Sequence, residues 1–138
     1  MINMKINRLL KIIRSVHSDC VIIIIDYNKF RIYNEDAYIS SYLFKYRICK
    51  LKYYDFIINK VEYLNYVKYN LRKLKINYII LDKHDGYNVI DKYIDSINNY
   101  LVYLKRSKIY DKRINIINKV KRIKDINKIM RIEKVIYS

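Results

Sequence analysis

The sequence predicts an α/β (α+β) fold, with a mixed sheet of about five to six strands flanked by helices and followed by C-terminal helices. Two mostly apolar segments, at residues 21–25 and 76–81, are too short for buried helices and are typical of strands covered on both faces. Segments with helical apolar spacing lie before and between them. The chain has 138 residues and 52% hydrophobic content, enough for one core. We therefore expect a mixed α/β domain at residues 1–90 and a basic helical extension at 91–138.

The first element is expected to be a basic amphipathic helix at residues 4–17. Apolar residues recur there at helical spacing, with lysine and arginine mostly on the other side. Such a helix can lie on a membrane surface or cover one face of a sheet. Because a strand follows closely, we expect it to cover the sheet.

Residues 21–33 predict two strands joined by a turn at residues 26–28. The first strand is the apolar run, and the second, at 29–33, carries cations at alternate positions. Side chains alternate between the faces of a strand. One face of the second strand then carries Lys29, Arg31 and Tyr33, and the other carries Phe30 and Ile32.

The next helix is expected at about residues 35–45. Asn34 is of a type that accepts hydrogen bonds from the first N–H groups of a helix. Glu35 and Asp36 follow it, where the helix dipole favours negative charge.

Two strands and a third helix are expected after it. Residues 47–51 alternate as a third strand, and residues 56–58 are a short fourth strand. Asn59 with Glu62 resembles a capping box at the start of a helix. The apolar stripe of that helix would be Leu64, Val67, Leu71 and Leu74.

The buried strand at 76–81 ends at a strong turn signal, residues 82–86, which contains the single glycine of the chain. Apolar residues then recur at helical spacing, which predicts one helix over residues 88–106. From Ile114 to Val135 they recur every third residue, a spacing that drifts by about 60° per step around a helix. Either the apolar stripe winds around one helix, or the helix is broken near Asp125.

Charge makes polyanions the first class of partner to consider. The net charge is +16, and residues 104–138 hold 12 Lys+Arg against 3 Asp+Glu. One glycine cannot supply a glycine-rich phosphate loop. Cys20 and Cys49 are expected to be buried free thiols, and His17 and His84 lack metal-ligand neighbours. We predict no cofactor, no metal and no membrane span, and a soluble, cytoplasmic protein.

Catalysis is not expected. Asp82, His84 and Asp85 gather after a strand end, but turn chemistry explains them, since Asp-Gly is a favoured turn pair. Asp26 is expected to form an exposed ion pair with Lys29 across the turn.

Residues 10–37, LKIIRSVHSDCVIIIIDYNKFRIYNEDA, resemble the start of the N-terminal mismatch-recognition domain of the MutS DNA mismatch-repair family. That domain opens with a helix ending in His-Pro-Asp/Glu, an apolar strand, a Gly-Asp-Phe-Tyr-Glu turn into a second strand, and a Tyr-Glu-Asp-Ala helix start. Residues 17–19 match the first feature and residues 34–37 the last, without a gap. Residues 71–82 are similar to the helix, turn and strand that close the domain, so the resemblance covers residues 4 to about 90.

The resemblance fails at the residues with which the family reads a mispaired base. The family's stacking Phe corresponds to Lys29, its Tyr to Phe30, its hydrogen-bonding Glu to Arg31, and its turn glycine to Tyr27. A register slip by one residue would place Phe30 at the stacking position, but it would also invert the buried face of the strand. The family's clamp, lever and ATPase domains have no counterpart in this chain.

Two functions are therefore considered. The first is binding of DNA or another polyanion, mainly through phosphate contacts that position without reading sequence. Its expected contact residues are Asn28, Lys29, Phe30, Arg31, Lys119, Arg122 and Lys124. The alternative is a module that binds a second copy or a protein partner through residues 109–136, with no direct DNA contact.

Overall fold

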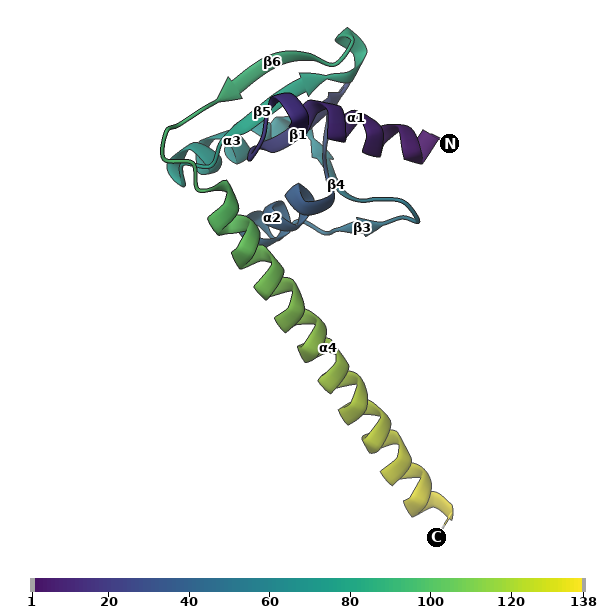
Figure 1. Ribbon diagram of the computed structural model, residues 1–138. Coiled ribbons are helices and arrows are strands. Elements are labelled where there is room, and N and C mark those ends of the chain that lie inside the picture. The colour runs from purple at the N-terminus through teal and green to yellow at the C-terminus, as the bar shows by residue number, and fades with distance from the viewer. Residues whose placement is uncertain (1, 138) are drawn as a thin grey trace.

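The computed structural model describes the backbone of residues 2–137 and the side chains of residues 5–128. It confirms the predicted fold class: a mixed sheet of six strands in the order β3-β4-β2-β1-β5-β6, with four α-helices (Figure 1). The strands are β1 (Val21–Asp26), β2 (Lys29–Tyr33), β3 (Cys49–Lys50), β4 (Asp55–Lys60), β5 (Tyr78–Asp82) and β6 (Asn88–Tyr93). The helices are α1 (Ile2–Val16), α2 (Asn34–Phe44), α3 (Leu64–Lys73) and α4 (Tyr100–Tyr137).

The two central strands, β1 and β5, are parallel and buried on both faces, as predicted. Val21 pairs with Tyr78 and Ile25 with Asp82, while every other pair of neighbouring strands is antiparallel. Ile22 packs with α1 on one face, and Ile23 packs with α2, α3 and the start of α4 on the other. The sheet is thus a middle layer between α1 and the remaining helices.

Strand β2 has the predicted alternation. Phe30 and Ile32 are fully buried on the face that packs against α2 and α3. Arg31 lies between them on the opposite face, where Tyr33 packs under α1. The predicted register is therefore correct, and the slipped register that would free the Phe30 ring is not adopted.

The predicted helix over residues 88–106 is wrong. Residues 88–93 form edge strand β6, which returns from the turn at Gly86 and pairs antiparallel with β5. Without β6, the outer backbone N–H and C=O groups of the buried strand β5 would lack hydrogen-bond partners. The free-energy cost of leaving them unpaired outweighs the preference for a helix that the apolar spacing indicates. Val89 and Ile90, which suggested a helical stripe, are 43% and 50% exposed on β6.

Both predicted asparagine caps are also wrong. Asn34 has a φ of 53°, and its side chain bridges elements by accepting from the Asp55 N–H at 3.1 Å and donating to Asn7 at 3.1 Å. Asn59 lies within β4, and α3 begins only at Leu64, after one 3-10 turn. The third strand is shorter than expected, and Cys49 on it is partly exposed rather than buried.

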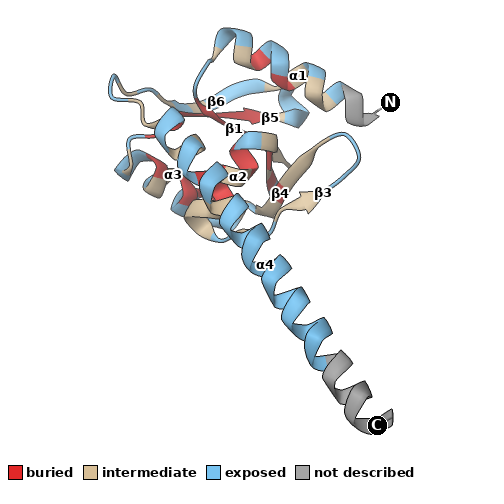
Figure 2. Cartoon of the chain, turned by 60° about the horizontal axis from the view of Figure 1, so that its bottom comes forward, coloured by how far each residue is buried: buried red, intermediate tan, exposed pale blue. Residues whose placement is uncertain are grey.

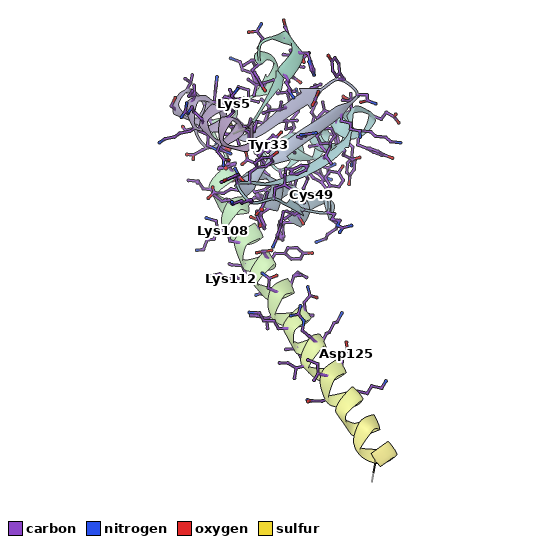
Figure 3. All side chains as sticks on the ribbon, turned by 90° about the vertical axis from the view of Figure 1, so that its right-hand side faces the viewer. Lys5, Tyr33, Cys49, Lys108, Lys112 and Asp125 are labelled. Carbon is purple, nitrogen blue, oxygen red and sulfur yellow. The ribbon has the colours of Figure 1, made fainter. Side chains whose placement is uncertain are left out.

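Helix α4 is one unbroken helix of 38 residues through Asp125, so the apolar stripe winds around it. Its first turns pack on α2: the rings of Tyr103 and Tyr110 lie 6.5 Å and 5.4 Å from that of Tyr42, and Ser107 is 1% exposed. Every described residue from 112 to 128 is exposed. The helix therefore projects away from the sheet (Figures 1 and 2) and displays its side chains in all directions (Figure 3).

Candidate nucleic-acid interface

Strand register gathers cations at one end of the sheet. Lys60 on β4 lies opposite Lys29 on β2, Lys29 lies opposite Asp26 on β1, and Lys83 directly follows the neighbouring strand β5. We call the cluster of Lys29, Lys60, Lys83 and the adjoining Tyr27 the basic end of the sheet. Like charges directly opposite each other destabilise a sheet. The Lys29–Lys60 pair is thus a place where a bound anion would relieve repulsion.

An exposed aromatic ring lies within the basic end. Tyr27 is 75% exposed, adopts a left-handed φ of 57° in the turn between β1 and β2, and stacks on the His84 ring with centroids 3.6 Å apart. An exposed ring beside cations is a surface on which nucleic-acid bases stack. The sequence identified Tyr27 only as a replacement for a turn glycine, and Lys60 was missed because its pairing with Lys29 depends on the register of β4.

Asp26 does not pair with Lys29, contrary to the prediction. Its Oδ1 lies 2.6 Å from His84 Nε2, and its Oδ2 lies 3.6 Å from Lys83 Nζ. The hydrogen bond with His84, with Lys83 nearby, lowers the pKa of Asp26. Among the side chains of residues 5–128, Lys29 forms no ion pair.

The other predicted hairpin residues differ in their access to a ligand. Asn28 is exposed, and its carbonyl accepts from the Val61 N–H at 2.9 Å. The Phe30 ring is fully buried, so its predicted contact with nucleic acid is not possible in this structure. The Arg31 guanidinium lies 5.6 Å from the centroid of the Phe56 ring, and its buried Nε has no hydrogen-bond partner within the described chain.

The predicted helical cations lie on the projecting part of α4. Its exposed residues 112–128 contain seven Lys+Arg and one Asp. Lys119, Arg122 and Lys124 are all exposed, and none of residues 112–128 forms an ion pair with another described side chain. The nearest ion pair along α4 joins Lys108 Nζ to Glu35 Oε1 at 3.7 Å. This part of α4 is a continuous source of uncompensated positive charge.

The structure does not join the two basic surfaces. Helix α4 begins near the first residue of β1, where the Tyr100 hydroxyl reaches Asp36, whereas Lys29 follows the turn at the far end of β1. Arg31 moreover faces α1, on the opposite side of the sheet from α2 and α4. One continuous concave surface holding the hairpin cations and the α4 cations is therefore absent from the described chain.

A buried polar network fixes the base of α4 to the domain. Asp36 is 1% exposed and accepts from the Ile22 N–H at 3.0 Å, from the Tyr100 hydroxyl at 2.7 Å, and from the Arg14 guanidinium. Burial raises the pKa of Asp36, while Arg14 opposes that effect. The predicted role of Asp36 at a helix N-terminus is thus combined with a role in joining α1, β1, α2 and α4.

The remaining candidates from the sequence show structural roles. Asp82 accepts from the His84 backbone N–H at 2.9 Å, a contact within the turn. Burial raises the pKa of the Cys20 thiol to about 12, so it is a poor nucleophile. Among the described side chains, no group of three or more His, Cys, Asp or Glu is placed to hold a metal. The predictions that the protein has no catalytic, metal or cofactor site stay predictions.

Comparison with known proteins does not assign the chain to a family. No model of a known protein family matches the chain. A search of curated proteins likewise finds no match. Within the described residues, none of the helices combines the length and apolar character needed to cross a bilayer. The resemblance to the MutS recognition domain stays a prediction.

Proposed function

We propose that the protein binds nucleic acid, most simply DNA, through phosphate contacts, and that it has no enzymatic activity. The observation that carries this proposal is the projecting part of α4, where seven cations and one carboxylate occupy the exposed residues 112–128. A net charge of +16 strengthens the attraction over the whole chain. Because lysine and arginine contacts to phosphate carry no sequence information, we expect little sequence preference.

The basic end of the sheet supplies a second contact region in this proposal. Lys29 and Lys60 would hold phosphates, and the exposed Tyr27 ring would stack on a base. The two regions lie at different ends of the domain, so they would contact separate segments of one nucleic acid or two different molecules. If the MutS resemblance reflects descent, this chain keeps the position of the reading hairpin but carries charge instead of the reading residues.

Salt dependence tests the proposal. Full-length protein would be titrated into a fluorescently labelled duplex at several salt concentrations, with anisotropy as the readout. An assumed six neutralised phosphates give a slope of log affinity against log salt of about −5. Binding that is unaffected by salt, or no binding at low salt, would contradict it. Parallel titrations with single-stranded and mismatched probes show which form is preferred.

Self-association through α4 is a second candidate, favoured by its exposed apolar residues. Ile116, Ile123 and Ile126 are 60%, 58% and 49% exposed, and monomers seldom leave such side chains in water. The apolar residues spaced by three wind around α4, whereas a two-stranded coiled coil needs a repeat of about 3.5 residues. We therefore expect a short contact between copies rather than a coiled coil along the whole helix.

Analytical ultracentrifugation of the full chain tests this candidate. Under it, the protein is larger than a monomer, and replacing Ile116 and Ile123 with serine restores the monomer. The control replaces Tyr66 and Tyr69, which are 57% and 66% exposed on α3, with serine and leaves the assembly unchanged. A wild-type monomer at all concentrations would exclude it.

We also propose a cytoplasmic location. Both cysteines, Cys20 and Cys49, are free, which is typical of proteins in a reducing compartment.

A further inference from the structure

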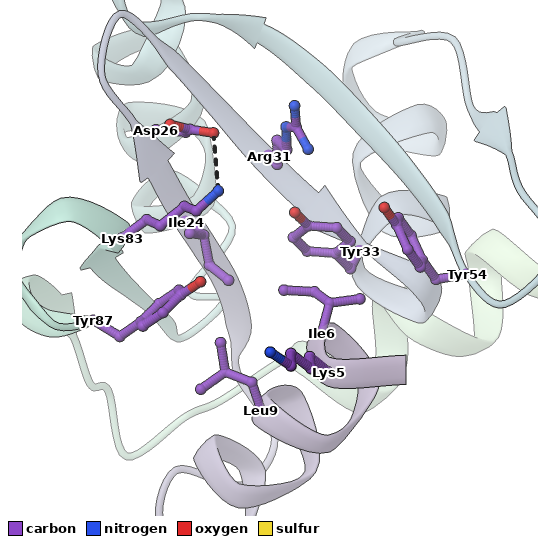
Figure 4. Close-up of a pocket in the computed structure, with 10 residues that line it drawn as sticks. All are labelled: Lys5, Ile6, Leu9, Ile24, Asp26, Arg31, Tyr33, Tyr54, Lys83 and Tyr87. Atoms are coloured by element: carbon purple, nitrogen blue, oxygen red, sulfur yellow. Dashed lines mark ion pairs between the residues drawn. The ribbon is translucent and has the colours of Figure 1, made fainter. Parts of the chain in front are cut away.

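A pocket lies between α1 and the face of the sheet that α1 covers (Figure 4). Its volume is about 330 Å³, and it lies beside the basic end of the sheet. Side chains from α1, β1, β2, the loop before β4, and the turn after β5 line it: Lys5, Ile6, Leu9, Ile24, Asp26, Arg31, Tyr33, Tyr54, Lys83 and Tyr87. Helix α4 is on the other side of the sheet, so this pocket is separate from the α4 surface.

The charge of the lining favours an anion. Three cations, Lys5, Arg31 and Lys83, face a single carboxylate, Asp26, whose charge is already shared with Lys83 and His84. Arg31 is the central cation of this set: its Nε has no hydrogen-bond partner among the described residues, and its planar guanidinium presents several N–H donors that suit phosphate oxygens.

The remaining lining residues fit the other part of an amphiphilic ligand. The Tyr87 hydroxyl points toward the middle of the pocket and the Tyr33 hydroxyl toward Arg31, while Ile6, Leu9 and Ile24 form an apolar wall (Figure 4). Tyrosine hydroxyls can donate to phosphate oxygens, and the apolar wall can contact a planar ring or a sugar face. The volume is near the lower end of the roughly 300–1,000 Å³ typical of ligand pockets, so the ligand must be small.

We propose that this pocket binds a small phosphate monoester with a planar or sugar body, such as a nucleoside monophosphate, with Arg31 and Lys83 on the phosphate. Arg31 binds phosphate through parallel N–H donors, and Lys83 adds a point charge at the mouth of the pocket, where its side chain is 47% exposed. The same phosphate chemistry is present in a free nucleotide and at the 5′ end of a nucleic-acid strand. The proposal does not depend on nucleic-acid binding by α4.

Calorimetric titration of the full chain tests it, with AMP, UMP, ribose 5-phosphate and adenosine as probes at about 50 mM salt, where the screening length is still more than 10 Å. At least one phosphate ester is expected to bind. Adenosine, which lacks the phosphate, is expected to bind more weakly by a factor of about ten or more, because charge-assisted hydrogen bonds contribute about 1.5–3 kcal/mol. A 5′-phosphorylated oligonucleotide and its unphosphorylated counterpart separate the two sources of the phosphate. Failure of all three esters and of the phosphorylated oligonucleotide overturns the proposal.

Variants locate the binding. Arg31→Gln and, independently, the surface change Lys83→Gln should each weaken the ester by about tenfold, because each removes a charged contact. Lys73→Gln is the matched control: it removes one exposed charge from α3, on the other face of the sheet and outside the pocket, and it should change affinity by less than about twofold. Equal effects of Lys83→Gln and Lys73→Gln would overturn the proposal, as would full affinity in both pocket variants.

Amide shift mapping by NMR separates this site from α4. With the bound ester, shifts should centre on residues 5–9, 24–33 and 83–87, and residues 112–128 should be unaffected. A response centred on 112–128 would overturn the pocket while leaving the proposed nucleic-acid binding intact. Conversely, charge removal on α4 that abolishes DNA binding should leave ester binding unchanged.

Discussion

Isoleucines occupy opposite environments in the sheet and in α4. Ile22 and Ile23 on β1 are fully buried, whereas Ile116 and Ile123 on α4 are 60% and 58% exposed. The difference arises because β1 has strand neighbours and helical layers on both faces, whereas α4 leaves the domain after about three turns. Apolar content therefore identifies the core only where other elements cover it. The packed domain therefore accounts for most of the folding stability, and the exposed part of α4 provides a surface that a partner can contact.

The sharpest test of this contrast is one substitution in each region. Ile57→Ala in β4, where the side chain is fully buried, should lower the free energy of unfolding by about 2–5 kcal/mol, since it removes packing and leaves a cavity. Ile123→Ala should change it by less than about 0.5 kcal/mol, as for exposed positions generally. Urea unfolding measures both. A large, concentration-dependent loss in Ile123→Ala would show that α4 is buried in an assembly.

The junction between the regions is expected to be nearly as sensitive. Asp36→Asn removes the charge that Arg14 and Tyr100 share, and we expect a loss of about 1.5–3 kcal/mol because a hydrogen-bonded charge pair is broken. The neighbouring Glu35→Gln is the control: Glu35 is exposed, its contact with Lys108 is 3.7 Å long, and a loss below about 1 kcal/mol is expected. Equal losses of unfolding free energy in the two variants would contradict a stabilising role for the hydrogen bonds of Asp36.

The elements of the fold that could be predicted from the sequence are the strands whose side chains form the core. The β-branched runs of β1 and β5 and the alternation in β2 identified buried strands and their faces, because period-two burial leaves few other solutions. Strand β6 was missed because it is an exposed edge strand whose sequence mimics helical spacing, and only the open edge of β5 requires it. The asparagine caps failed because Asn34 hydrogen-bonds to residues distant in sequence.

The candidate site was predictable only in its charge. Lysine and arginine counts identified α4 as basic, and the winding apolar stripe was one of two alternatives drawn from its spacing. The separation of α4 from the hairpin depends on which sheet face each element covers. The pairing of Lys29 with Lys60 and the stacking of Tyr27 on His84 arise from register and turn geometry. None of these relations is encoded in local sequence pattern.

A smaller effect of pH is expected at the basic end of the sheet. The hydrogen bond with His84 lowers the pKa of Asp26 in the folded state, so Asp26 stabilises the fold above the unfolded pKa of about 3.9 and loses that contribution as pH falls through its folded value. The difference in unfolding free energy between wild type and Asp26→Asn should be below about 1 kcal/mol at pH 7 and vanish in acid. Urea midpoints at several pH values measure it.

The control for this pH effect is His84→Gln, which removes the main cause of the lowered pKa. In that background the difference due to Asp26→Asn should shrink. A difference that grew as pH fell would contradict the assignment.

The central claim, that the exposed cations of α4 hold nucleic acid, is tested most directly by two triple variants of equal charge. In one, Lys119, Arg122 and Lys124 become glutamine; in the other, Lys50, Lys52 and Lys73, which are exposed on the domain, do. The salt dependence of duplex binding is measured for both. We predict that the slope of log affinity against log salt concentration becomes shallower by up to about 2.7 in the α4 variant, since each lost phosphate contact changes it by about 0.9. The domain variant should keep the wild-type slope. Identical slopes in the two variants would contradict the claim.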